Sequence, residues 1–498
     1  MTRPKTRLLS KSRYLLGLQC PRLLWLHVNE PERIPAVDES TQFIFDQGHE
    51  VGNLAKQLFP DGIDIPAEDF SLNLEESRRL LSTRRPLFEA AFMSNGKYAR
   101  VDILQPTGDD SWNIIEVKSS TSVKRVNYDD VAFQRHCLHE AGVEVDRCFL
   151  AHIDNTYVRN GDIVPEGLFR LVDITDEVYA RQSATAARAK ELLLMMASPA
   201  CPEHQVGPCC TDPYDCALRE ECWSFLPDHS VFTLHHIGAE AFRLMEAGHL
   251  VITDLPADMP LKRQQRIQRD CLATGMPHIE PAAIRSFLAG LKYPLYYLDF
   301  ETLQTAVPLF NGISPYQSVP FQFSVHVVNS PGAPPEHHEF LAENHEDPRA
   351  RLLEALYTSL GEQGSIIAYH AQFEKRVLQE LALAFPEYQG WTERIFERMV
   401  DLLIPFRGFN YYHPLQRGSA SLKAVLPALT GLKYEGLGIA DGQLAGIAFL
   451  STRCDMAPEE ISRIRRDLLA YCGLDTGGMV SIIERLTELA NGVEAPHS

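Results

Sequence analysis

The sequence predicts an α/β protein in which two sections of alternating strands and helices flank a helical segment. Three observations support this fold class. Between residues 86 and 197, short β-rich runs bounded by turn residues are followed by longer runs with helical apolar spacing. Residues 226–290 carry mostly helical patterns, and from residue 293 strands and helices alternate again. A chain of 498 residues also exceeds one ordinary hydrophobic core, so several domains are expected.

The first section, residues 1–225, begins with a helix over 41–58 that Pro60-Asp61-Gly62 ends. Asn95-Gly96 is a strong hairpin turn between the first two of three expected strands. The strands are expected at 86–93, 97–105 and 111–118. A helix at 128–141, a strand near 145–153, a helix at 175–197 and a cysteine-rich loop at 201–222 follow.

The second section, 226–290, is expected to be a helical linker, and the third, 291–498, opens with the strand "YPLYYLDFE". In "FTLHHIGAEAFRLMEAGHLVITDL" the linker resembles a degenerate helix-hairpin-helix, whose glycine turn offers backbone N–H groups to a phosphate. The basic run from Lys262 to Arg269 would add a contact to DNA that is independent of sequence; a plain linker is the alternative. The third section continues with strands at 320–328 and 364–369 and helices at 347–360, 372–385 and to the end.

Composition narrows the class of protein. The net charge of −19 excludes a histone-like protein held to nucleic acid by bulk charge, although local basic surfaces remain compatible with it. No stretch reaches the length of a membrane span, and Pro21 and Arg22 interrupt the early apolar run, so no signal peptide is expected. We therefore expect a cytoplasmic protein without membrane contact, whose 11 cysteines are reduced, buried or metal-bound.

The strand 111–118 ends in "EVK", which carries a carboxylate and an ammonium group into a core. Alternation puts Glu116 and Lys118 on one face of the strand, and Asp102 on the preceding strand is the expected partner. Two carboxylates at one site can bind Mg²⁺ or Mn²⁺, and a lysine beside them can position the nucleophile. Taken alone, the tripeptide is better explained by an ion pair at the surface.

Asp102 followed by Glu-x-Lys resembles the pattern of PD-(D/E)XK nucleases. Gln134, on the helix after the strand pair, resembles the glutamine of the RecB-type motif, although Leu138 stands where a tyrosine is usual. The resemblance implies that Asp102 and Glu116 bind metal and that Lys118 and Gln134 assist.

One position departs from this pattern. Many RecB-like nucleases carry a metal-binding histidine on the first helix, where this chain has Gly52. Glu50 is a candidate substitute ligand, and a solvated helix face explains it equally well.

The cysteines give a second resemblance. Cys210, Cys216 and Cys222 are evenly spaced, with Cys209 adjacent and Cys201 upstream, and Cys20 lies far away in "GLQCPRLLW". One N-terminal cysteine with three C-terminal ones resembles the iron–sulfur RecB-like nucleases of the CRISPR-associated adaptation type. That resemblance implies a 4Fe–4S cluster on Cys20, Cys216, Cys222 and Cys210 or Cys209. A Cys₄ zinc site is the rival, but it favours tighter pairs of cysteines.

The third section carries another set of acids. Asp299 and Glu301 alternate on a buried strand, Glu374 lies at a strand–helix junction, and Tyr471 precedes Asp475 by four residues on a helix. In this order they resemble the DEDD exonucleases of the RNase H-like fold, in the subtype with a tyrosine. The resemblance implies that the four acids bind two metal ions and that Tyr471 orients the attacking water.

Glu374 stands where aspartate is usual in that family, and Asp401 is a possible substitute ligand. An inactive RNase H-like fold that keeps some acids for structure is the alternative for this section. The whole chain resembles an uncharacterised bacterial domain-of-unknown-function family that fuses the two nuclease types. We therefore expect a metal-dependent nuclease that acts on nucleic acid, DNA in the first instance, from ends or on single strands. A non-catalytic nucleic-acid-binding scaffold and a zinc-binding regulator are the competing hypotheses.

Overall fold

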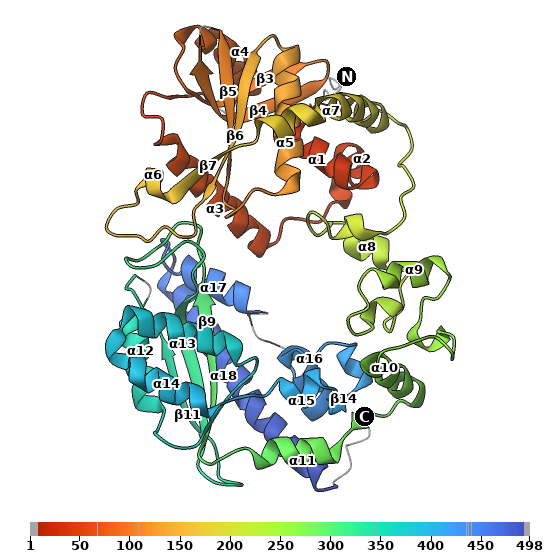
Figure 1. Cartoon of the computed structure of the whole chain (residues 1–498), viewed down its shortest axis with the longest axis vertical. Coiled ribbons are helices and arrows are strands. Elements are labelled where there is room, and N and C mark those ends of the chain that lie inside the picture. The colour runs from red at the N-terminus through yellow and green to blue at the C-terminus, as the bar shows by residue number, and fades with distance from the viewer. Residues whose placement is uncertain are drawn as a thin grey trace. The chain divides into compact units, whose positions relative to one another are not determined.

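The computed structural model describes residues 8–66, 68–108, 110–343, 345–434, 436, 438–439 and 441–492. It divides into two compact units (Figure 1). Unit 1 comprises residues 1–225 together with 305–317, and unit 2 comprises 226–304 and 318–498. The expected linker 226–290 is thus grouped with unit 2, and residues 305–317 are grouped with unit 1 although unit 2 flanks them on both sides. The protein is mixed α/β throughout.

Unit 1 is built on a seven-stranded sheet in the order β2-β3-β4-β5-β6-β7, with β1 pairing with β4. The hairpin between β3 and β4 turns at Asn95 and Gly96, whose φ values of +48° and +76° are those of a type I′ turn. The strands are β1 (Leu9–Ser10), β2 (Ile63–Asp64), β3 (Leu87–Ser94), β4 (Lys97–Thr107), β5 (Ser111–Lys118), β6 (Glu144–Ile153) and β7 (Phe169–Asp173). The four that the sequence predicts agree within two residues at each end, and β1, β2 and β7 were not expected.

Helices cover both faces of this sheet (Figure 1). On β5, Ile114 packs in the core beneath α5 (Arg125–Glu140) and α7 (Thr175–Met196), whereas Ile115 packs in the core of the other face with α3 (Glu39–Lys56). Alternation therefore turns Glu116 and Lys118 toward α5. Helices α1 (Lys11–Gln19), α2 (Pro21–Asn29) and α4 (Phe70–Leu80) complete the first face.

Residues 305–317 complete the second face of unit 1. Ala306 and Val307 are buried in the same core as Phe88 and Ile115. The Tyr316 hydroxyl donates to the carbonyl of Ser119 at 2.6 Å, directly after Lys118. Unit 1 therefore takes part of its core from a segment that lies far along the chain.

Unit 2 contains a five-stranded sheet in the order β11-β10-β9-β12-β13. Strands β12 and β13 run parallel to β9, whereas β10 is antiparallel to both β9 and β11. The strands are β9 (Leu295–Leu303), β10 (Val319–Val328), β11 (Glu336–Leu341), β12 (Ser365–Ala368) and β13 (Met399–Asp401). Strands β9, β10 and β12 agree with the prediction within two residues.

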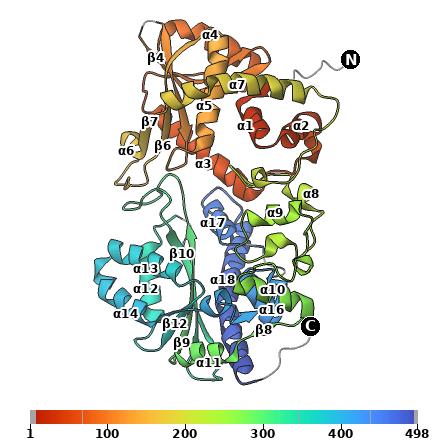
Figure 2. The same cartoon turned by 45° about the vertical axis from the view of Figure 1, so that its right-hand side comes forward.

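The two faces of the unit 2 sheet bear different helices (Figure 2). Tyr296, Leu298 and Phe300 of β9 pack under α12 (Arg349–Ser359), α13 (Gln372–Ala384) and α14 (Gln389–Arg398). Leu295 and Tyr297 face the long helix α18 (Pro458–Ala490) instead, with α11 (Pro281–Ala289) and α16 (Leu422–Thr430) alongside. Asp299 and Glu301 share the face of Leu295 and Tyr297, so β9 presents its carboxylates to α18.

The remaining elements of unit 2 are short. The segment before β9 is mostly helical, with α9 (Glu240–Glu246), α10 (Arg263–Thr274) and α11, and the small strand β8 (His278–Ile279) pairs with β14 (Tyr411–Tyr412). Helices α15 (Ile404–Arg407) and α17 (Gly442–Ser451) lie between β13 and α18 along the chain. Among the described residues, no helix has the length and apolar character needed to cross a membrane.

Candidate functional site

Buried carboxylates converge on α18 in unit 2. One ligand atom each from Asp299, Glu301 and Cys472 lie within 4.8 Å of one another, a spacing that can hold a metal ion. Asp475, one turn along α18 from Tyr471, belongs to the same cluster, because its charge raises the pKa of both Asp299 and Glu301. Motifs about 170 residues apart in the sequence are thus brought together.

The acids of this cluster are removed from water, which disfavours their charged forms. Burial, followed by the neighbouring carboxylates, raises the pKa of Asp299 and Glu301 well above the usual range. Burial also raises the pKa of Asp475 from 3.8 to about 6. Buried carboxylates require a proton or a cation. Lys423 of α16 is the cation that acts on Glu301 and Asp475, and it opposes these shifts only in part.

Glu374 reaches the same region from the first turn of α13. It is 1% exposed, and its Oε2 has no hydrogen-bond partner among the described residues. Burial and then the charge of Asp299 raise its pKa well above the usual range. An unpartnered buried carboxylate oxygen near another carboxylate suits a bound cation.

Two tyrosines and a cysteine line the carboxylate cluster. The Tyr434 hydroxyl donates to Oδ1 of Asp475 at 2.5 Å, and the ring of Tyr434 lies 6.3 Å from that of Tyr471. The Cys472 Sγ lies 3.6 Å from Oδ2 of Asp299. The sequence predicted Tyr471 as a site residue but not Tyr434 or Cys472. Cys472 is buried and packs against the acids.

Asp401 ends β13 at the same end of the sheet, but its carboxylate accepts hydrogen bonds from backbone N–H groups. Its Oδ1 accepts the N–H groups of His370 and Leu403, each at 3.0 Å. His370 has a φ of +73°, and Asp401 holds this strained turn just before α13 begins. Asp401 also raises the pKa of Glu374, behind burial and Asp299, so it lies near the cluster without joining it.

In unit 1, Glu116 is the centre of a hydrogen-bonded network. It is fully buried and accepts from Lys118 at 2.6 Å and, through Oε2, from Gln134 at 2.7 Å. Asp130, one turn before Gln134 on α5, accepts from both Lys118 at 2.8 Å and Gln134 at 3.0 Å. Asp102 accepts the N–H of Val117 at 2.8 Å. The predicted residues thus lie together, and the structure adds Asp130.

Lys11, the first residue of α1, is the second unexpected member of this network. Its Nζ lies 2.7 Å from Oε1 of Glu116 and 3.6 Å from Oδ1 of Asp102. Although burial disfavours its charge, the two carboxylates hold the pKa of Lys11 above its usual value. An ammonium group therefore stands between the two carboxylates expected to bind metal.

The pKa values of the two acids of unit 1, Glu116 and Asp102, are shifted in opposite directions. Burial disfavours the charged form of Glu116, but Lys11 and Lys118 bring its pKa below the usual range. Burial, then the charge of Glu116, raises the pKa of Asp102 from 3.8 to about 6. Unit 1 thus neutralises its carboxylates with lysines, whereas the acids of unit 2 lie mainly against one another.

The cysteine-rich loop folds against α2. Cys20, Cys210 and Cys216 are buried in one cluster with the partly buried Cys201, Cys209 and Cys222. Gln19 donates to the carbonyls of Cys209 and Tyr214, and Arg22 pairs with Glu221 at 2.8 Å. Burial, and then neighbouring thiols, raise the pKa of Cys20 and Cys216. The expected long-range meeting of Cys20 with the loop therefore occurs.

Glu50 does not join the unit 1 network. It is exposed on α3, which covers the other face of the sheet, and at Gly52 a Cβ would meet nothing within 4 Å. The basic run after Lys262 is partly engaged within unit 2, since Arg263 donates to the carbonyl of Gly408 at 2.8 Å and pairs with Glu280.

Comparison with known proteins bears on unit 2 most directly. Residues 296–421 match DUF2779, a domain of unknown function. This match covers Asp299, Glu301, Glu374 and Asp401. The expected likeness to an uncharacterised bacterial domain-of-unknown-function family is confirmed over these residues.

Two curated relatives are also similar to the chain. An uncharacterized protein of Mycoplasma pneumoniae, the MG366 homolog, is 26% identical over 220 residues, which is 40% of this chain and 33% of that protein. Uncharacterized protein MG366 of Mycoplasma genitalium is 23% identical over the same length. The chain thus spans about a third of the length of these relatives. Neither their names nor the family description states an activity.

Proposed function

We propose that the chain is a metal-dependent nuclease that hydrolyses phosphodiester bonds in nucleic acid, with DNA as the expected substrate. One observation carries the proposal: the half-buried Asp299 lies close to the buried Glu301, Asp475 and Glu374, and one Glu374 oxygen has no partner among the described residues. Oxygen ligands in this arrangement suit Mg²⁺ or Mn²⁺. Ligand atoms of Asp299 and Glu301 lie within 4.8 Å of each other, and Asp475 and Glu374 approach from α18 and α13.

The residues around the acids have roles that follow from their contacts. When bound, the metal would lower the pKa of a water molecule and offset charge on a phosphate oxygen. Tyr434 fixes the Asp475 carboxylate through its hydrogen bond. Tyr471 lies beside Tyr434, and the resemblance to DEDD exonucleases implies that it orients the attacking water. Lys423, whose Nζ lies 5.3 Å from the centre of the Tyr471 ring, adds positive charge where a phosphate would arrive. The same resemblance favours removal of nucleotides from a 3′ end by an RNase H-like exonuclease domain.

Unit 1 is a second candidate nuclease site, of the PD-(D/E)XK type. The observation in its favour is that Asp102, Glu116, Lys118 and Gln134 form one connected network. A metal ion at Asp102 and Glu116 would take the position of the Lys11 ammonium, so Lys11 has to withdraw first. The rival hypothesis is that unit 1 has lost catalysis and only binds nucleic acid. This hypothesis predicts that Lys11 neutralises the site permanently.

The cysteine cluster of unit 1 suits a 4Fe–4S cluster held by Cys20, Cys216, Cys222 and Cys210. Zinc bound by four thiolates keeps its sulfurs about 3.8 Å apart, and among the described residues no three of these thiols lie within 4.8 Å of one another. This spacing does not match a Cys₄ zinc site, and the iron–sulfur cluster is proposed from the resemblance. It would clip α2 to the loop after α7.

The test is a cleavage assay with matched variants. Protein purified without oxygen is assayed for iron and zinc, then incubated with end-labelled single- and double-stranded DNA and Mn²⁺. We expect Asp299→Ala to abolish removal of nucleotides from 3′ ends. Asp455→Ala, at an exposed position of unit 2, should leave cleavage intact.

Lys118→Ala removes any cutting by unit 1, so the activity that remains comes from unit 2. Activity of the wild-type protein no greater than that of the Asp299→Ala/Lys118→Ala variant would refute the nuclease proposal and leave a binding scaffold. Zinc in place of iron would refute the cluster alone.

A further inference from the structure

Unit 2 contains a basic cavity beside the acidic cluster that the proposed chemistry does not use. Its volume is about 660 Å³, within the range of small-ligand sites. The fifteen described residues that line it include two arginines and three histidines, but no aspartate or glutamate. In a chain with 66 acidic against 47 basic residues, such a lining is a local reversal of charge.

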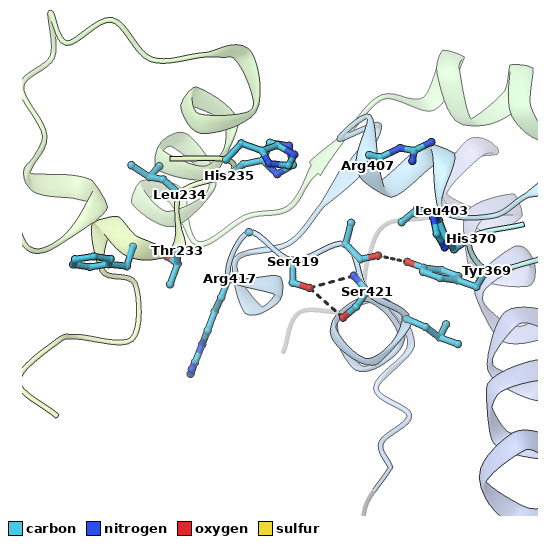
Figure 3. A pocket seen from close by; sticks show the side chains of 15 residues that line it. Thr233, Leu234, His235, Tyr369, His370, Leu403, Arg407, Arg417, Ser419 and Ser421 are labelled. Carbon is cyan, nitrogen blue, oxygen red and sulfur yellow. Dashed lines mark hydrogen bonds between the residues drawn. The ribbon is translucent and has the colours of Figure 1, made fainter. Parts of the chain in front are cut away.

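Four segments of unit 2 build the wall of the cavity, at 232–236, 369–370, 403–407 and 417–422 (Figure 3). Ser419 and Ser421 stand in the middle, with His235 on one side and Tyr369 on the other. The Tyr369 hydroxyl donates to the carbonyl of Ala420 at 2.6 Å, which joins the end of β12 to the loop before α16. Gly418 lies so close to the 232–236 segment that a Cβ would come 2.2 Å from the carbonyl oxygen of Thr233. The wall is therefore tightly assembled from distant parts of the sequence.

Polar groups of this wall remain available to an anion. The Ser419 hydroxyl accepts the N–H of Ser421 at 3.2 Å, and the Ser421 side chain makes no capping bond to α16. At the start of α16 the N–H groups of Ala424 and Val425 both turn back to the carbonyl of Ser421, so the two arginines carry the attraction for an anion. Arg417 pairs with Asp228 at 3.2 Å, and Arg407 lies 4.0 Å from Asp401. Both arginine side chains are more than half exposed, so these pairs are weak and a phosphate can replace the carboxylates.

The cavity and the acids share one end of the sheet. Ile367 of β12 pairs with Tyr297 of β9, and two residues further along these parallel strands come Tyr369 and Asp299. The cavity therefore begins at the level of the first acid. His370, also in its wall, donates its N–H to Asp401 and immediately precedes the helix that carries Glu374.

We propose that this cavity binds the phosphate backbone of a single nucleic-acid strand, next to the phosphodiester presented to the acids. Arg407 and Arg417 contact phosphates, the Ser421 hydroxyl can donate to a phosphate oxygen, and His235 lies in the wall where a base can stack. A single strand fits because its bases are free to stack on side chains, whereas the bases of a duplex stack on one another. The inference rests on the proposed function, since it names the substrate class of the same site.

Binding is measured by fluorescence anisotropy with a labelled oligothymidylate in EDTA, so that no cleavage occurs. We expect Arg407→Gln/Arg417→Gln to raise Kd at least about tenfold and to reduce the slope of log K against log salt by about 1.4, or 0.7 for each phosphate contact. Arg351→Gln/Arg394→Gln carries the same charge change at exposed positions outside the cavity and should bind as wild type does.

A second pair of variants needs no arginine. Ser419→Glu adds a negative charge to the wall, which repels a phosphate and should abolish binding. Ser462→Glu, at an exposed serine of α18, should leave binding unchanged. Thermal unfolding checks that all variants fold. Binding that is equal in the cavity and control variants, while Asp299→Ala still abolishes cleavage, overturns this inference alone. A wild-type protein that neither binds nor cleaves the strand overturns the proposed function with it.

Discussion

Replacing Glu116 by glutamine tests the charge network of unit 1. The substitution keeps the shape of the side chain but removes the negative charge that Lys11, Lys118 and Gln134 share. Lys118 keeps Asp130 at 2.8 Å, whereas Lys11 keeps only Asp102 at 3.6 Å. We expect Glu116→Gln to destabilise unit 1 because two ammonium groups lose their common partner.

The magnitude follows from burial. Removing one partner of a buried ion pair costs about 3–5 kcal/mol. The side chain of Lys11 is 23% exposed and Lys118 retains Asp130, so the lower end, about 3 kcal/mol, is expected. Adding Lys11→Met to Glu116→Gln removes the ammonium group that Glu116→Gln leaves without its main partner. The double variant should therefore be more stable than the sum of the single variants predicts, by about 1.5 kcal/mol.

Urea unfolding in EDTA, followed by tryptophan fluorescence, measures this coupling. Trp25, Trp112 and Trp223 lie in unit 1, and Trp391 is the remaining one of the four tryptophans. A Trp391→Phe background makes the signal report on unit 1 alone.

Lys190→Met, at an exposed position of α7, is the control for Lys11→Met and should change the free energy of unfolding little. Strict additivity of Lys11→Met and Glu116→Gln would refute the view that Lys11 is the cation of this site.

Three further predictions concern stability. Because burial raises the folded pKa of Asp475 from 3.8 to about 6, metal-free protein binds a proton on folding; about 3 kcal/mol of stability, present in full below the unfolded pKa, is lost as pH rises through the folded pKa, so its Tm in EDTA should fall between about pH 4 and about pH 6 and Asp475→Asn should flatten that fall. Gly364→Ala should lower the Tm of unit 2 severely, since φ is +91° and a Cβ would lie 2.0 Å from a backbone oxygen, whereas Gly390→Ala on α14 should be neutral by calorimetry. Val307→Asp should destabilise unit 1 by about 2–4 kcal/mol in the same urea assay, because an unpaired charge enters its core; an unchanged midpoint would contradict that packing.

Local patterns predicted most strands and several site residues. Strands β3 to β5 are readable because turn residues bound runs of apolar residues, and Glu116 with Lys118 follows from alternation along one of them. The edge strand β11 was missed because its residues are mostly exposed and polar, so no apolar period marks it.

Lys11 and Asp130 were missed for a different reason. Only tertiary packing brings α1 and α5 to β5, and nothing in the alternation of that strand names its partners. One signal could have indicated Asp130: it precedes Gln134 by four residues and therefore shares its helix face. No comparable spacing connects Lys11 with Glu116.

The segment 305–317 governs the order in which the protein can fold during synthesis. Unit 1 cannot close its core when Phe225 leaves the ribosome, because Ala306 and Val307 have not yet been translated. Its apolar patch around Phe88 and Ile115 stays open while about eighty more residues emerge. Strands β8 and β9 of unit 2 are made before unit 1 is complete, so the two units must mature together. For the same reason, recombination at a single point in the gene cannot transfer either unit intact.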